Sequence, residues 1–144
     1  MFADLLRRLT APDPEQVPDA DARLALGALL VRIARADGDY AQVEKDSISD
    51  ILAARYPDAD IDWLMSECEA FEAEAPDTVR FTRAIKDAVA YDDRLAVVEA
   101  MWEVVLADGV RETHENQLMR LVPPLIGIED LDSHMARRKV ESRK

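Results

Sequence analysis

The sequence predicts an all-α protein, a single-domain bundle of about seven helices built from two pseudo-symmetric helix-turn-helix repeats. Three observations support this prediction. Apolar residues recur with helical spacing along most of the chain, and no segment alternates with the period of a strand. The length of 144 residues is that of one domain. An Ala-Asp-Gly motif occurs twice, at 36–38 and 107–109, each time between two helical patterns.

The first half of the chain predicts three long helices. The first runs from about Asp21 to Ala36, and the second ends at Pro57 because proline lacks a backbone N–H. The third begins after Asp58 or Asp60, either of which can cap it. The apolar stripes of these helices are, in order, Leu26, Leu29, Leu30 and Ile33; Ile48, Ile51 and Leu52; and Ile61, Leu64, Met65, Cys68 and Phe71.

The second half predicts four more helices. Asp77 follows a proline and is the expected N-cap of the fourth helix, and the fifth begins near residue 92 or 93. The sixth covers about 113–122 and is expected to bend or stop at Pro123 and Pro124. A short last helix begins near residue 130. The inward-facing residues of the fourth and fifth helices are Phe81, Ile85, Ala88 and Val89, then Leu95, Val98, Met101, Trp102 and Val105.

Three segments make up the predicted domain organisation. Residues 1–19 form a short amphipathic helix and a proline-containing linker, residues 20–140 form the helical domain, and residues 141–144 are a basic tail end. The apolar side chains of the first segment either pack on the domain, which is favoured, or rest on a membrane surface. The longest apolar run, 24–31, is too short to span a bilayer.

The charge is strongly acidic, with 30 acidic and 18 basic residues and a net charge of −12. Such a chain repels nucleic-acid phosphates and anionic membranes, so neither nucleic-acid binding nor stable membrane insertion is expected. Eight acidic residues and no Lys or Arg lie between Tyr56 and Val79. They form either a solvated face or a surface for a basic protein partner or cations. A single cysteine and no export signal predict a cytoplasmic protein, whose oligomeric state the sequence does not indicate.

The two Ala-Asp-Gly corners carry the main candidate site. Their glycines can adopt positive φ and end a helix, which places Asp37 and Asp108 at the start of the next helix as caps. An EF-hand is excluded because apolar and basic residues occupy its first ligand positions. Either the carboxylates only cap helices, or the two corners also share a cation such as Ca²⁺ or Mg²⁺. The candidate metal ligands are Asp37, Asp39, Glu44, Asp108, Glu112 and Glu115.

Catalysis is not predicted. His114 and His134 are isolated histidines, and Cys68 lies on an apolar stripe, where a buried, unreactive thiol is favoured over a nucleophile. Trp63 and Trp102 are expected to contribute hydrophobic surface rather than a stacking platform, since no basic patch surrounds them.

Two parts of the chain resemble the TerB family of tellurite-resistance proteins. One is the first corner with Glu44, and the other runs from Trp102 through the second corner and Glu115 to residues 118–122. The resemblance covers about 20–140. It implies a helical bundle of repeated hairpins, a cytoplasmic location and involvement in resistance to tellurite and other stresses. It also implies a divalent metal at an acidic cluster, here Asp37, Asp39, Glu44, Asp108 and Glu115. We therefore expect a non-catalytic acidic interaction module, with a divalent-metal sensor or buffer as the alternative.

Overall fold

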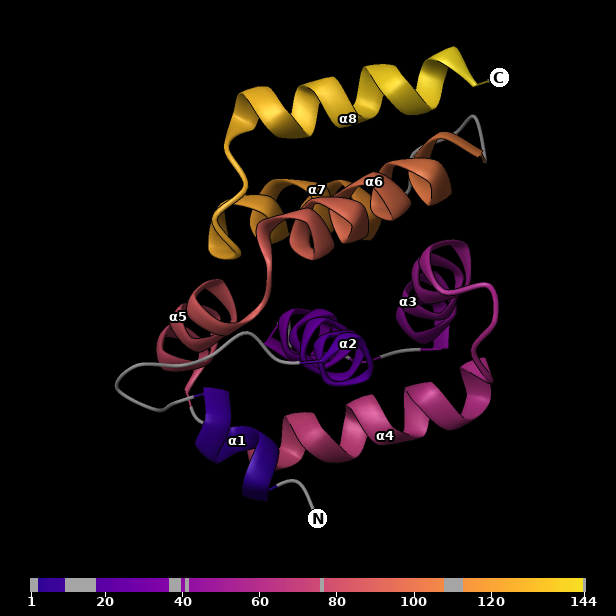
Figure 1. Ribbon diagram of the computed structural model, residues 1–144. Coiled ribbons are helices and arrows are strands. Elements are labelled where there is room, and N and C mark those ends of the chain that lie inside the picture. The colour runs from indigo at the N-terminus through magenta and orange to yellow at the C-terminus, as the bar shows by residue number, and fades with distance from the viewer. Residues whose placement is uncertain are drawn as a thin grey trace.

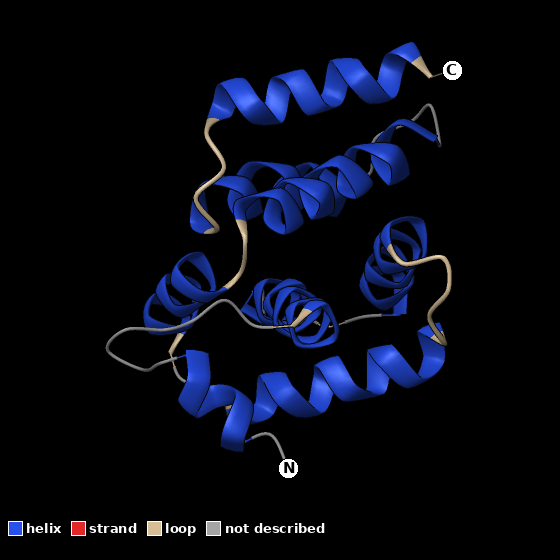
Figure 2. Cartoon of the chain, viewed as in Figure 1, coloured by secondary structure: helices blue, strands red, loops and turns tan. Residues whose placement is uncertain are grey.

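The computed structural model describes residues 3–9, 18–36, 40, 42–75, 77–107 and 113–143. Within these residues all regular secondary structure is helical (Figure 2), which confirms the predicted all-α class. The helices are α1 (Ala3–Leu9), α2 (Asp19–Ala36), α3 (Gln42–Arg55), α4 (Ile61–Glu74), α5 (Thr78–Ala88), α6 (Tyr91–Ala107), α7 (Thr113–Leu125) and α8 (Asp130–Ser142). Helix α1 is the predicted N-terminal helix, and α2 to α8 are the predicted bundle.

Helix α2 lies in the middle of the molecule and contacts α3, α4, α5, α6 and α7 (Figure 1). Every residue from Ala25 to Val31 is buried, so this helix is covered on all sides. The reason is its sequence: a helix that is apolar all round is stable in water only when neighbours surround it. The predicted stripe of α2 lies entirely in this core.

The other helices form layers around α2. Helices α1 and α4 lie on one side, α6 and α7 on the opposite side, and α8 is outermost beyond them (Figure 1). Leu5 and Leu9 of α1 are buried, and α1 contacts α5. The apolar side of the N-terminal helix therefore packs on the body, as favoured from the sequence. The rings of Phe71 and Phe81 meet edge to face, with centroids 5.9 Å apart, and join α4 to α5.

Side-chain caps fix the starts of α4 and α5. The Asp60 carboxylate accepts a hydrogen bond of 3.2 Å from the backbone N–H of Trp63, so Asp60 is the cap among the two predicted candidates. Asp77 accepts a hydrogen bond of 3.1 Å from the N–H of Arg80, as predicted. An aspartate at this position satisfies an N–H that the first helical turn leaves unpaired.

A bend or a stop was expected at Pro123 and Pro124, and the stop is wrong, because α7 continues through both prolines to Leu125. Both lie in its last turn, where their carbonyl groups remain available. The N–H of Ile128 donates to the carbonyl of Pro123 (2.8 Å), and the N–H of Gly127 donates to that of Pro124 (3.2 Å). With Gly127 at a φ of 74°, this is a Schellman cap. The cap, rather than the prolines, ends the helix.

Replacing Gly127 by alanine is expected to lower the free energy of unfolding by about 1–2 kcal/mol. Alanine strains at this φ, and its Cβ would lie 2.9 Å from Nη1 of Arg94, whose guanidinium hydrogen-bonds the carbonyl of Ile126. Urea unfolding measures the change. The exposed neighbour Glu129 makes no side-chain cap hydrogen bond, so Glu129→Ala is the control and should change stability by less than about 0.5 kcal/mol. Equal stability of the two variants would contradict the prediction.

Helix α8 continues to Ser142, past the boundary that the sequence suggested before residue 141. Lys139 of α8 and Arg143, which follows it, form ion pairs with α6. Arg143 contacts the carboxylates of Glu99 (2.6 Å) and Glu103 (2.8 Å), and Lys139 lies 3.5 Å from Glu99. The C-terminal bases thus neutralise acidic residues of the same chain.

Among the described residues, no helix has both the length and the apolar character needed to cross a membrane.

Candidate functional site

The residues of the two Asp-Gly corners lie outside the described residues, but the helices that flank each corner are described. The first falls between the end of α2 and the start of α3, and the second between the end of α6 and the start of α7. The helices of each corner contact one another, α2 with α3 and α6 with α7. The two helix pairs also contact each other, through α2 and α7 and through α3 and α6.

Most of the predicted metal ligands lie outside the described residues. This is the case for Asp37, Asp39, Asp108 and Glu112, and Glu115 is described only as part of α7. Glu44 is half-buried in the first turn of α3. The described residues contain no group of three or more histidine, cysteine or carboxylate side chains that could hold a metal ion. The metal site therefore stays a prediction.

A buried ion-pair cluster lies beside the first corner. Glu72 of α4 is only 7% exposed, and its carboxylate bridges two arginines of α2. Arg32 Nε lies 3.0 Å from Oε2 and Arg35 Nη1 lies 2.6 Å from Oε1. Arg32 also donates to the backbone carbonyls of Glu72 (3.0 Å) and Ala75 (3.1 Å). The cluster joins the last turns of α2 to the end of α4, and so fixes where α2 enters the first corner.

Tyr40 follows the first corner directly. Its ring has Arg35 at 5.2 Å and Lys45 at 5.1 Å from its centroid. Its hydroxyl is buried and accepts or donates no hydrogen bond among the described residues. Burial raises the pKa of Tyr40 well above its usual value, and the nearby Glu69 carboxylate adds to the rise. Tyr40 therefore stays protonated and can serve as a hydrogen-bond donor, but not as a base.

The acidic segment between Tyr56 and Val79 is divided between structural and exposed roles. Glu72 is buried, Asp60 and Asp77 cap helices, and Asp58 lies 3.5 Å from Arg23. Asp62 is exposed in the first turn of α4. The segment is therefore not a uniform solvated face.

Trp63 lies on this acidic segment and is 61% exposed, so the hydrophobic surface expected of it faces outward. The apolar stripe of α4 turns Leu64 and Met65 inward and leaves Trp63 facing outward. Trp102 of α6 is buried as expected, and its Nε1 lies 3.2 Å from the hydroxyl of Ser133 on α8.

Residues 23–138 match the family model described as tellurite resistance protein TerB. The chain belongs to the TerB family. No match was found among curated proteins or among solved structures. The TerB match begins within α2 and ends within α8, so it includes both Asp-Gly corners and the Glu72 cluster.

Membership of the TerB family implies a role related to tellurite resistance, and the family is generally non-catalytic. The pairing of Glu72 with Arg32 and Arg35 was not predicted, because Glu72 is one of eight acidic residues in its segment. A usable signal was present. Glu72 lies four residues after Cys68, on the apolar stripe of α4, and a carboxylate at such a position must be paired.

Cys68 is buried in this TerB-family chain, as predicted, and burial raises the pKa of its thiol to about 12. The thiolate is the reactive form, so at about pH 8 the folded protein is expected to resist alkylation by iodoacetamide. In urea the thiol becomes accessible and its pKa returns to the usual range, so modification should be complete within minutes. Mass spectrometry of the modified protein measures both. Fast labelling of the folded chain would contradict the inert assignment.

Proposed function

We propose that this TerB-family protein is a cytoplasmic, non-catalytic interaction module of the tellurite and stress response, and that it binds a protein partner through the acidic segment around Trp63. The observation that supports this most directly is Trp63 itself. A tryptophan that is 61% exposed beside the exposed carboxylates of Asp60 and Asp62 combines a large apolar surface with negative charge. Tryptophan is enriched among the residues that contribute most to protein interfaces.

The charge of the chain limits the kind of partner. A net charge of −12 favours a partner with basic groups near its contact surface, and opposes direct capture of an oxyanion such as tellurite. Lysine or arginine side chains of the partner would meet the carboxylates of the acidic segment and the face of the Trp63 ring.

The test compares two exposed apolar side chains. Trp63→Ser removes the proposed anchor, and Leu131→Ser removes a side chain on α8 that is 64% exposed and lies outside the acidic segment. In cells whose tellurite resistance depends on this chain, Trp63→Ser is expected to lower the tolerated tellurite concentration. Leu131→Ser is expected to leave it unchanged. Circular dichroism checks that both variants fold. Full resistance with a folded Trp63→Ser variant would overturn the proposal.

The second candidate function is a divalent-metal sensor or buffer, with Ca²⁺ or Mg²⁺ held between the corners by Asp37, Asp39, Glu44, Asp108, Glu112 and Glu115. The packing of the four flanking helices favours it. Contacts of α2 with α7 and of α3 with α6 hold the two helix pairs against each other. Such an arrangement suits carboxylates from both corners sharing one hard cation.

Calorimetric titration with Ca²⁺, Mg²⁺, Mn²⁺ and Zn²⁺ distinguishes the two functions. Under the metal hypothesis, binding is lost in a folded Asp37→Ala/Asp108→Ala variant and kept in an Asp62→Ala/Asp87→Ala variant. The second pair removes the same charge from exposed positions outside the corners. An absence of heat with every ion at millimolar concentration would leave the interaction module alone.

A further inference from the structure

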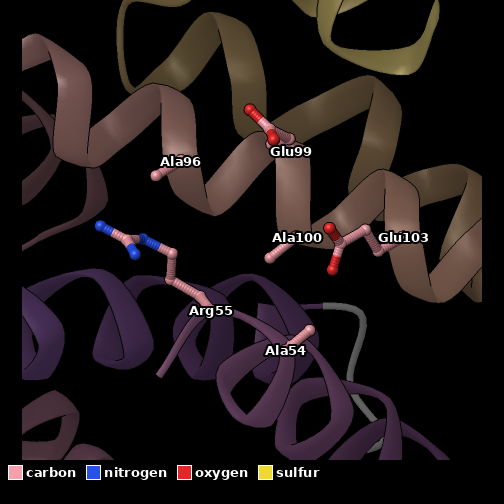
Figure 3. A pocket seen from close by; sticks show the side chains of 6 residues that line it. All are labelled: Ala54, Arg55, Ala96, Glu99, Ala100 and Glu103. Atoms are coloured by element: carbon pink, nitrogen blue, oxygen red, sulfur yellow. The ribbon is translucent and has the colours of Figure 1, made fainter. Parts of the chain in front are cut away.

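A small groove lies between α3 and α6 and is independent of the corners and of the acidic segment. Its volume is about 190 Å³. Three alanines line it among mainly polar surface, the arginine of α3 extends toward Ala96 at one end, and Glu103 lies at the other end (Figure 3). Glu99 lies between them, with its carboxylate directed toward α8. The lining residues are Ala54, Arg55, Ala96, Glu99, Ala100 and Glu103.

Arg55 is the last residue of α3 and extends into this groove. Its Nε is buried and makes no hydrogen bond among the described residues. Its closest carboxylate, that of Asp93, is 3.8 Å from Nη2, and its guanidinium lies 5.2 Å from the centre of the Tyr56 ring. Arg32 and Arg94, which are also partly buried, each hydrogen-bond to backbone carbonyls. A guanidinium has five N–H donors, so Arg55 can take a carboxylate from outside the chain.

The glutamate end of the groove has the opposite charge. Arg143 reaches Oε1 of both Glu99 and Glu103, and Lys139 approaches the second oxygen of Glu99. Oε2 of Glu103 is left as an acceptor in the described part of the chain. Between Ala96 and Glu103 the helix rises by roughly 10 Å, which sets the length of the groove along α6.

We propose that this groove binds a small linear zwitterion, with its carboxylate on Arg55, its methylene chain on the alanines and its ammonium group at Glu103. A simple carboxylate would bring no cation to the two glutamates at its far end. A diamine would place a positive charge against the positive charge of Arg55, which is unfavourable. A zwitterion carries no net charge, so the overall negative charge of the protein does not repel it. A volume of about 190 Å³ exceeds the roughly 150 Å³ of a cavity known to hold benzene.

The probe is 6-aminohexanoate, titrated into the 144-residue chain and followed by amide chemical shifts. We expect a dissociation constant in the low-millimolar range, as for a ligand of about nine non-hydrogen atoms, with shifts concentrated on α3 and α6. Hexanoate and hexylammonium each keep one charge and should bind at least about tenfold more weakly. Shifts confined to other helices, or no shifts at about 100 mM probe, would overturn the proposal.

Two variants separate the roles of the charges. Arg55→Gln should weaken binding of 6-aminohexanoate by about tenfold or more, whereas Arg23→Gln should not. Arg23 is the matched control because its guanidinium also lies on the Tyr56 ring, at 4.6 Å, but outside the groove. Glu103→Gln should weaken 6-aminohexanoate and leave hexanoate unchanged or tighter. Unaltered affinity in a folded Arg55→Gln variant, or equal binding of hexanoate and 6-aminohexanoate, would refute the assignment.

Discussion

Glu72→Gln is expected to lower the free energy of unfolding by about 2–3 kcal/mol, measured by urea denaturation. Removing one partner from a buried ion pair typically costs about 3–5 kcal/mol, because the remaining charge stays buried. The side chain of Arg32 is only 15% exposed and would lose its counter-charge, although it keeps its bonds to two backbone carbonyls. Arg35 is 41% exposed and can turn to water, which reduces the loss.

Glu74→Gln is the matched control for this prediction. Glu74 lies in the same helix and has the same charge, but it is exposed. Its substitution should change stability by less than about 0.5 kcal/mol. If both variants unfold at the same urea concentration, Glu72 does not stabilise the junction of α2 and α4.

Gly27→Ala is expected to destabilise the protein by about 1–3 kcal/mol, against the usual preference of helices for alanine. Gly27 is buried in α2 where this helix crosses α4. A Cβ atom there would lie 2.3 Å from Sγ of Cys68, far inside van der Waals contact. Cys68 is fully buried, so its sulfur has little room to move, and either α4 shifts or the thiol strains.

Repeating the Gly27→Ala substitution in a Cys68→Ala protein tests whether contact with Cys68 causes the loss of stability. Cys68→Ala removes the sulfur but keeps Cβ, which would lie at an acceptable 3.5 Å from the new methyl group. In that background Gly27→Ala should be neutral or stabilising by up to about 1 kcal/mol, since only helix propensity remains. Thermal or urea unfolding of the four proteins completes the cycle. The same loss in both backgrounds would disprove the steric explanation.

The candidate site was only partly predictable. The Asp-Gly corners follow from local rules, because the repeated motif predicts where two helices end and two begin. The burial of Glu72 and the exposure of Trp63 depend on which side of α4 faces α2. The apolar stripe of α4 contains enough information to place both residues. That Arg32 and Arg35 are the partners of Glu72 follows only from the packing of two helices far apart in sequence.

The groove between α3 and α6 also could not be predicted from local sequence. The alanines at positions 54, 96 and 100 favour a helix, but they do not predict that a groove forms there. Only the packing of α3 on α6 places these small side chains together, with an arginine and two glutamates around them.

The order of the helices and two of their caps were determined by the sequence, since periodicity and capping act over a few neighbouring residues. Tertiary structure decided that Lys139 and Arg143 bind α6, and which residues of the acidic segment are buried or remain exposed. These outcomes depend on contacts between residues tens of positions apart, whose geometry is set by the whole core and by no local pattern.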